Sequence, residues 1–223
     1  MYTGLVNIYW LDLVGVFAFA FLGARLAIEQ RCNALGVFVY GFLAALGGGT
    51  VREIMLNHLP FYFRNNTYLL VVAMAALFSA LLYQRFRAVR SVVVIMDAVG
   101  AVAFAYIGAH AASLAHFGLA GTAFFAVLTA CGGGVLCEVV ACKAPRAFHD
   151  GFYTVPPIML GCTYWLLGDA VYNPTTSVAL LASSFVAQLT VAHAGLITRK
   201  LRAKRHASQA RTALLILRGT ADI

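Results

Sequence analysis

The stretches ALGGGTVREIMLNHLP (residues 45–60) and ACGGGVLCEVVACKAP (residues 130–145) are two copies of one pattern. Each has three consecutive glycines, a glutamate four residues after the last glycine and a proline seven residues after the glutamate. A shift of 85 positions extends the match to residues 12–60 and 97–145, with 17 identities in 49 pairs. Because Asp, Glu and Pro are rare in this chain and still match, the pattern indicates an internal repeat.

The composition around these stretches excludes a soluble fold. Of the 223 residues, 62% are hydrophobic and 11% are charged, whereas about a quarter of the residues of a soluble protein are charged. Uncharged runs such as 32–51, 65–84 and 170–198 approach or exceed the ~20 residues that a helix needs to cross a bilayer. Membrane strands would alternate polar and apolar residues, which these runs do not, so the spans are expected to be helices.

We therefore expect an all-α fold with seven transmembrane helices in one domain, residues 1–198. The expected helices are 9–28, 34–56, 68–84, 92–115, 119–141, 153–167 and 177–197. Repeat one is 9–84 and repeat two is 92–167. Each repeat has three crossings, so the second copy is inverted, and such repeats commonly form a substrate or ion site between them. The seventh helix has no counterpart in the repeat.

The basic residues predict the orientation. With the N-terminus outside, 14 of the 16 Lys and Arg residues fall on the inner side, as the positive-inside rule requires. The C-terminus is then cytoplasmic, and residues 199–223 form a basic cytoplasmic tail that we expect to contact anionic lipid headgroups. The net charge of +8 follows from this bias, so nucleic-acid binding is not expected.

The glycine triplets, Gly47, Gly48 and Gly49 with Gly132, Gly133 and Gly134, allow two interpretations. Three glycines weaken a helix by about 1 kcal/mol each relative to alanine, which favours a bend whose carbonyl oxygens line an ion pathway. The alternative is close helix packing on small residues. The pore-lining interpretation is favoured for the paired triplets. Thr50 either lines the pathway or bonds to its own helix backbone.

Four acidic residues occupy repeated positions. Glu53 and Glu138 either border the ion pathway or neutralise a cation, with Arg52 and Lys143 as the candidates. Asp12 and Asp97 lie near helix starts, where a carboxylate caps the positive helix end or takes part in ion pairing. Arg52, whose repeat counterpart is Cys137, is either a gate or one side of a permanent salt bridge.

Signatures of catalysis are missing from the sequence. It contains neither CxxC nor HExxH spacing, so no metal site is expected, and no nucleophile and base are paired. We therefore predict no catalytic residues, no enzyme activity and no cofactor other than permeant K⁺ or Na⁺ in a pore.

The doubled triplet with its glutamate and proline resembles the trimeric intracellular cation (TRIC) channel family in its prokaryotic form, also described as bacterial glycine transporters. The resemblance covers roughly residues 9–198. It implies a homotrimer with one pore per subunit, kinked at the triplets and selective for monovalent cations, chiefly potassium. The triplets and Thr50 would border that pore, with Arg52 and Glu53 near it. Bacterial relatives typically have a basic residue at both positions before the glutamate, whereas the second position here is Cys137.

The expected function is a passive potassium channel, also conducting sodium, in the bacterial cytoplasmic membrane. The alternative is a coupled transporter of a small solute such as glycine, which the same repeat and acidic residues would suit.

Overall fold

The computed structural model describes residues 8–86, 90–149 and 153–194, and all regular secondary structure in these residues is helical. The long helices are α1 (Ile8–Glu29), α2 (Ala34–Met55), α3 (Thr67–Phe86), α4 (Arg90–Leu114), α5 (Leu119–Val140), α7 (Val155–Leu167) and a last helix, Pro174–Ala194. Three short helices connect them: η1 (Phe61–Phe63), α6 (Arg146–His149) and η2 (Gly168–Tyr172). The predicted all-α class is confirmed, and the predicted basic tail, 199–223, lies outside the described residues.

Six of the long helices are long and apolar enough to cross a membrane. The exception is α7, which has 13 residues, fewer than the ~20 that a perpendicular crossing needs. The protein is thus an all-helical membrane protein with six candidate spans in its described part. The count of seven crossings stays a prediction.

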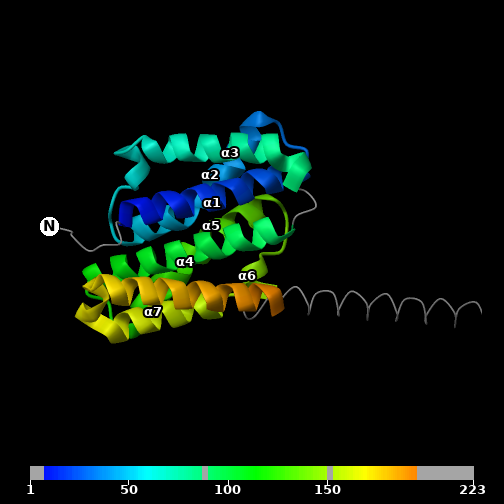
Figure 1. Ribbon diagram of the computed structural model, residues 1–223. Helices are drawn as coiled ribbons and strands as arrows, with labels where there is room; N and C mark the ends of the chain where they lie inside the picture. Colours follow the sequence, from blue (N-terminus) through cyan, green and yellow to red (C-terminus); the bar gives the residue numbers. More distant parts are fainter. Residues whose placement is uncertain (1–7, 87–89, 150–152, 195–223) are drawn as a thin grey trace, which may run out of the picture.

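The helices lie side by side, with α3 along one edge of the bundle and α7 with the last helix along the other (Figure 1). The two most buried spans are α1 and α4, which pack against each other in the centre. Around them, α1 also contacts α2 and α3, α4 also contacts α5 and α7, and α2 packs along α5. The last helix meets α4 where the Tyr106 hydroxyl donates a hydrogen bond to Ser177 Oγ at 3.3 Å.

Equivalent residues of the two repeats end equivalent helices. Arg31 after α1 and His116 after α4 both have a φ of 59°, and Asn57 after α2 and Cys142 after α5 have φ values of 58° and 52°. This left-handed residue lets the next backbone N–H bond back to a free helix carbonyl. The N–H of His58 accordingly donates to Glu53 O at 2.8 Å, and that of Lys143 to Glu138 O at 2.9 Å.

The centre of the bundle is built from reciprocal contacts between the halves. Phe19 of α1 and Phe104 of α4, which are 85 residues apart, meet in an edge-to-face arrangement with 5.2 Å between ring centroids. Each ring also lies over a glycine of the other helix, Phe104 over Gly15 and Phe19 over Gly100, where a Cβ atom would collide with the ring. Such an exchange of equivalent contacts is what a pseudo-twofold arrangement of two related units produces.

Candidate functional site

The two glycine triplets meet where α2 crosses α5. A Cβ on Gly48 would lie 2.5 Å from the carbonyl oxygen of Thr129, and a Cβ on Gly133 would collide with the carbonyl oxygen of Ala44. Residues 48 and 133 are repeat equivalents, as are residues 44 and 129. The middle glycines therefore let the two backbones touch, as close helix packing on small residues requires.

The triplets do not interrupt their helices. Both α2 and α5 are continuous through residues 47–49 and 132–134, so no break frees carbonyl oxygens at the triplets. The outer glycines have other surroundings: Gly49 lies under the ring of Phe61, whereas a Cβ on Gly134 would have nothing within 4 Å. Gly47 and Gly132 also lie at the α2–α5 contact, each beside the middle glycine of the other triplet. A pore-lining role for the triplets stays a prediction.

Thr50 bonds to the backbone of its own helix, which is one of the two roles that the sequence allows for it. Its hydroxyl donates to Leu46 O at 2.7 Å and lies 3.4 Å from the hydroxyl of Tyr62. A hydroxyl that bonds to the carbonyl four residues earlier is satisfied without a ligand.

In the first repeat, two carboxylates are held by partners from different elements. Asp12 of α1 is buried and accepts a hydrogen bond from the Tyr68 hydroxyl of α3 at 2.9 Å. Glu53, near the end of α2, accepts from Arg52 Nε at 2.9 Å and from Arg52 Nη2 at 2.7 Å. The His58 ring lies 3.5 Å from the other Glu53 oxygen. We refer to these two groups together as the first charged cluster: Asp12 with Tyr68, and Glu53 with Arg52 and His58.

The second repeat rebuilds this cluster at equivalent carboxylates with a different cation. Asp97 of α4 accepts from the Tyr153 hydroxyl at 3.1 Å, 56 residues along the chain as for Asp12 and Tyr68. Glu138 accepts from Arg146 Nε at 2.6 Å and from the Arg146 backbone N–H at 2.8 Å. Arg146 Nη2 also lies 3.8 Å from Asp97. The second charged cluster is Asp97, Glu138, Arg146 and Tyr153.

These contacts correct two expectations. The helix-capping interpretation of Asp12 and Asp97 is wrong: neither carboxylate lies in the first turn of its helix, and both accept from tyrosine hydroxyls of distant elements. The cation that neutralises Glu138 is Arg146, not Lys143. Lys143 meets Glu138 only through its backbone N–H, because the left-handed turn at Cys142 ends the helix there and the Lys143 side chain is exposed.

Sequence reasoning missed Arg146, Tyr68 and Tyr153. The tyrosines had a signal, since they match at the same shift of 85 beyond the aligned segment. Arg146 had none, because its repeat counterpart is Phe61. Burial lowers the pKa of the Arg146 guanidinium, but Asp97, Tyr153 and Glu138 together hold it above its ordinary value, so Arg146 is a permanent cation.

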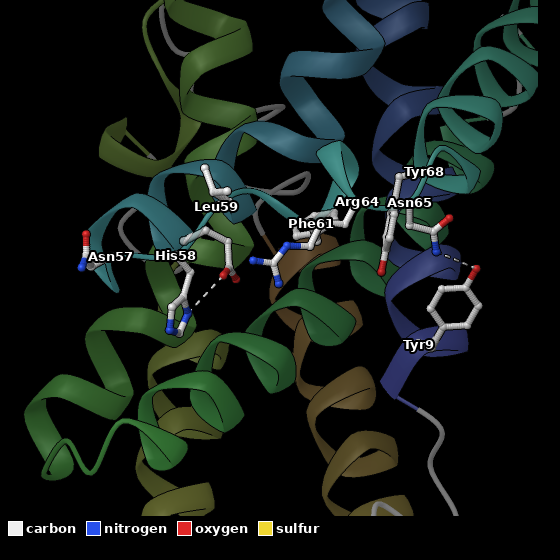
Figure 2. Close-up of a pocket in the computed structure, with 9 residues that line it drawn as sticks. Tyr9, Asn57, His58, Leu59, Phe61, Arg64, Asn65 and Tyr68 are labelled. Atoms are coloured by element: carbon white, nitrogen blue, oxygen red, sulfur yellow. Dashed lines mark hydrogen bonds and ion pairs between the residues drawn. The ribbon is translucent and has the colours of Figure 1, made fainter.

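Each charged cluster borders a pocket. The first pocket has a volume of about 600 Å³ and is lined by Glu53 and Tyr68 together with Tyr9, Arg64 and the turn after α2. In Figure 2, Asn57 and His58 lie at one end of this pocket and Tyr9, bonded to Asn65, at the other. The second pocket, of about 470 Å³, is lined by all four residues of the second charged cluster and by Lys143.

The two pockets lie at opposite ends of the bundle. Tyr9 of α1 lines the first, and Arg25 and Glu29 of the same helix line the second. At 1.5 Å per residue these positions are about 25–30 Å apart along α1. At each end of the bundle, a carboxylate that is bonded to an arginine therefore lies at the border of a pocket. Among the described residues, no group of three or more His, Cys, Asp or Glu side chains is placed to hold a metal ion.

Comparisons with known proteins identify similar membrane proteins. A family model described as "Glycine transporter" matches residues 9–84 and again 94–169, two segments offset by the repeat length of 85. The UPF0126 inner membrane protein YadS of Escherichia coli (strain K12) is 35% identical over 159 residues, 70% of this chain and 77% of YadS.

Solved structures of TRIC channels share the fold. One, described as "Structural basis for conductance through TRIC cation channels", has a TM-score of 0.74 and 26% identity and covers 87% of this chain and 95% of its own. The TRIC trimeric intracellular cation channel orthologue from Rhodobacter sphaeroides has a TM-score of 0.75 and 26% identity, covering 85% of this chain and 97% of its own.

Proposed function

Because the chain belongs to the prokaryotic TRIC family, whose family model is described as "Glycine transporter", we propose that it is a passive channel for monovalent cations. The channel conducts potassium and also sodium. The observation that carries the proposal is the pair of pockets at opposite ends of the bundle, bordered by the repeat-equivalent carboxylates Glu53 and Glu138. A cation entering from either side meets a carboxylate at the pocket on that side. We call the first pocket the first mouth of the pathway and the second pocket the second mouth.

The ion pathway of this proposal runs inside one subunit, between two inverted repeats. The reciprocal contacts of Phe19 with Phe104 and of Gly48 with Gly133 support a twofold relation between the repeats. Six candidate spans and the shorter α7 together give seven crossings. An odd number of crossings places the termini on opposite sides, and the distribution of basic residues puts the N-terminus outside and the C-terminus in the cytoplasm.

The structure corresponds to a closed channel under this proposal. Among the residues that the structure describes, the two pockets share none in their linings. The packed contact of Gly48 with Gly133 lies on α2 and α5, the helices that carry Glu53 and Glu138. Opening requires α2 and α5 to bend or separate at their glycine triplets, the segments of lowest helix propensity. Residues 47–50 and 132–134 then border the open pathway.

Three such subunits form the channel, each with its own pore, in the bacterial cytoplasmic membrane. The name of the R. sphaeroides protein, a trimeric channel, and that of YadS, an inner membrane protein, support the assembly and the membrane. The exposed apolar side chains of α3, such as Leu70, Met74 and Leu81, provide a surface for lipid or a neighbouring subunit.

Planar-bilayer recording of the purified protein in mixed potassium and sodium tests the proposal. Ohmic unitary steps that reverse near the potassium equilibrium potential support a cation channel. The paired variant Glu53→Gln/Glu138→Gln should lower unit conductance in dilute salt, because it removes the carboxylate from each mouth. Saturable glycine uptake into liposomes without unitary currents would instead establish a transporter, the activity in the family's description.

A further inference from the structure

Each repeat has a proline seven residues after its glutamate, and the residue that follows this proline differs between the repeats. Phe61 follows Pro60 and opens η1, whereas Arg146 follows Pro145 and opens α6. The two positions are 85 residues apart and are therefore repeat equivalents. The same place at the two mouths thus holds an aromatic ring in one repeat and a guanidinium in the other.

At the first mouth, Phe61 covers the glycine triplet. A Cβ on Gly49 would lie 3.0 Å from Phe61 Cε1 and 3.3 Å from Cζ, so the ring rests directly on the last glycine of the triplet. The Phe61 ring also packs against Tyr68, with 4.4 Å between centroids, and against Tyr62, at 5.8 Å. Phe61 and Tyr68 both line the first pocket, as Figure 2 shows.

At the second mouth, the equivalent space is open. The Arg146 side chain turns to Glu138 and lies 5.7 Å from the centroid of the Tyr153 ring. It leaves nothing within 4 Å of a Cβ on Gly134, the equivalent of Gly49. The second pocket accordingly reaches Gly134, Ala44 and Gly23 deep between the helices. The first pocket is lined by Phe61 and Tyr68 and has none of the triplet glycines in its lining.

We propose that Phe61 is an aromatic gate that closes the ion pathway at the first mouth and swings away from Gly49 when the channel opens. This inference rests on the proposed channel function. An apolar ring in a narrow passage excludes water and therefore ions, and a ring on a three-residue helix at the end of a loop can move without unpacking a transmembrane helix. The second mouth has no such gate and remains accessible to water, because the Arg146 side chain is held to one side by Glu138 and Asp97.

Single-channel recording of Phe61→Ala against Phe63→Ala tests the gate. Phe63 belongs to the same short helix, is 71% exposed and contacts Tyr62 but not Gly49, so it is a matched control for losing a phenyl ring. Phe61→Ala should raise open probability about two- to tenfold, the range expected when one aromatic pair no longer holds the closed state. Phe63→Ala should keep the wild-type open probability.

Phe61→Leu removes the ring, keeps an apolar side chain and keeps the test valid if Phe61→Ala does not fold. A leucine makes no aromatic contact with Tyr68 or Tyr62, so open probability should again rise. Wild-type open probability in both variants, or an equal rise in Phe63→Ala, would overturn the gate while leaving the channel intact. A wild-type protein without any unitary current would instead overturn the proposed function, and the gate with it.

Discussion

Gly48 of α2 lies directly against the backbone of Gly133 of α5, and the carbonyl oxygens of Thr129 and Ala44 fill the space where side chains would stand. The middle glycine of each triplet is thus a contact between helix backbones. The end glycine of each triplet is not, since Gly49 meets a side chain and Gly134 faces the second pocket. One repeated motif therefore serves both packing and the border of a pocket.

Replacing the middle and the end glycines should have opposite effects on stability. Gly48→Ala places a methyl group 2.5 Å from Thr129 O, so α2 and α5 must shift apart, at a cost of about 1–3 kcal/mol. Gly134→Ala meets nothing within 4 Å and gains helix propensity of about 1 kcal/mol. Thermal unfolding of the detergent-purified variants, followed by circular dichroism, checks this. Equal midpoints for the two variants would contradict the packing described for Gly48.

The helix positions and the repeated acidic residues were predictable from the sequence, because apolar runs and a rigid shift of 85 depend only on local composition and order. The hydrogen-bond partners of these acidic residues depend on which distant segments of the chain fold back against them. For Asp12 and Asp97 the sequence leaves helix capping and ion pairing open, whereas their donors are tyrosines 56 residues away. For Glu138 the sequence offers Lys143 as a candidate cation, whereas α6 folds back and places Arg146 beside the carboxylate. No spacing rule within one helix indicates such a contact.

Arg146 should stabilise the fold through its contact with Glu138. Arg146→Ala removes the guanidinium from Glu138, where it is bonded at 2.6 Å. Because the Arg146 side chain is 40% exposed, we discount the value of a charged hydrogen bond and expect a loss of about 1–2 kcal/mol. Adding Cys137→Arg puts a guanidinium at the position that Arg52 has beside Glu53, but Cys137 is 2% exposed and its sulfur lies 3.6 Å from Tyr40 O, so overpacking should add to the loss rather than recover it. Urea or thermal unfolding measures both effects.

Lys143→Ala is the charge-matched control for this pair of variants. The Lys143 side chain is exposed, and Lys143 bonds to Glu138 through its backbone N–H, so removal of the side chain should change stability by no more than about 0.5 kcal/mol. A loss as large as that of Arg146→Ala would mean that net charge at this mouth, rather than the bond to Glu138, determines stability.

The buried amide of the last helix is expected to destabilise the fold. Gln188 is 1% exposed, and neither its nitrogen nor its oxygen has a hydrogen-bond partner among the described residues. It lies among Ala101, Ala105 and Leu160 in a space with no room for a water molecule. Gln188→Met keeps the length of the side chain and removes the unpaired polar atoms, so stability should rise by about 1–2 kcal/mol. Ser183→Ala changes an exposed residue on the same helix and should leave the unfolding midpoint unaltered. If Gln188→Met instead lowers the midpoint, the amide of Gln188 has a polar partner.

Arg52 is the residue at which a gate and a permanent salt bridge predict different results. Its side chain is 6% exposed and is bonded through two nitrogens to Glu53, which is 15% exposed. Removing one partner of a buried pair costs about 3–5 kcal/mol because the other charge stays buried, so Arg52→Ala should lower the unfolding midpoint strongly. Arg52→Gln/Glu53→Gln removes both charges and should recover most of that loss. Recording the same two variants in bilayers completes the comparison: a salt bridge that only stabilises predicts wild-type open probability in the double variant, whereas a gating guanidinium predicts a channel that stays open more often even when stability has been regained.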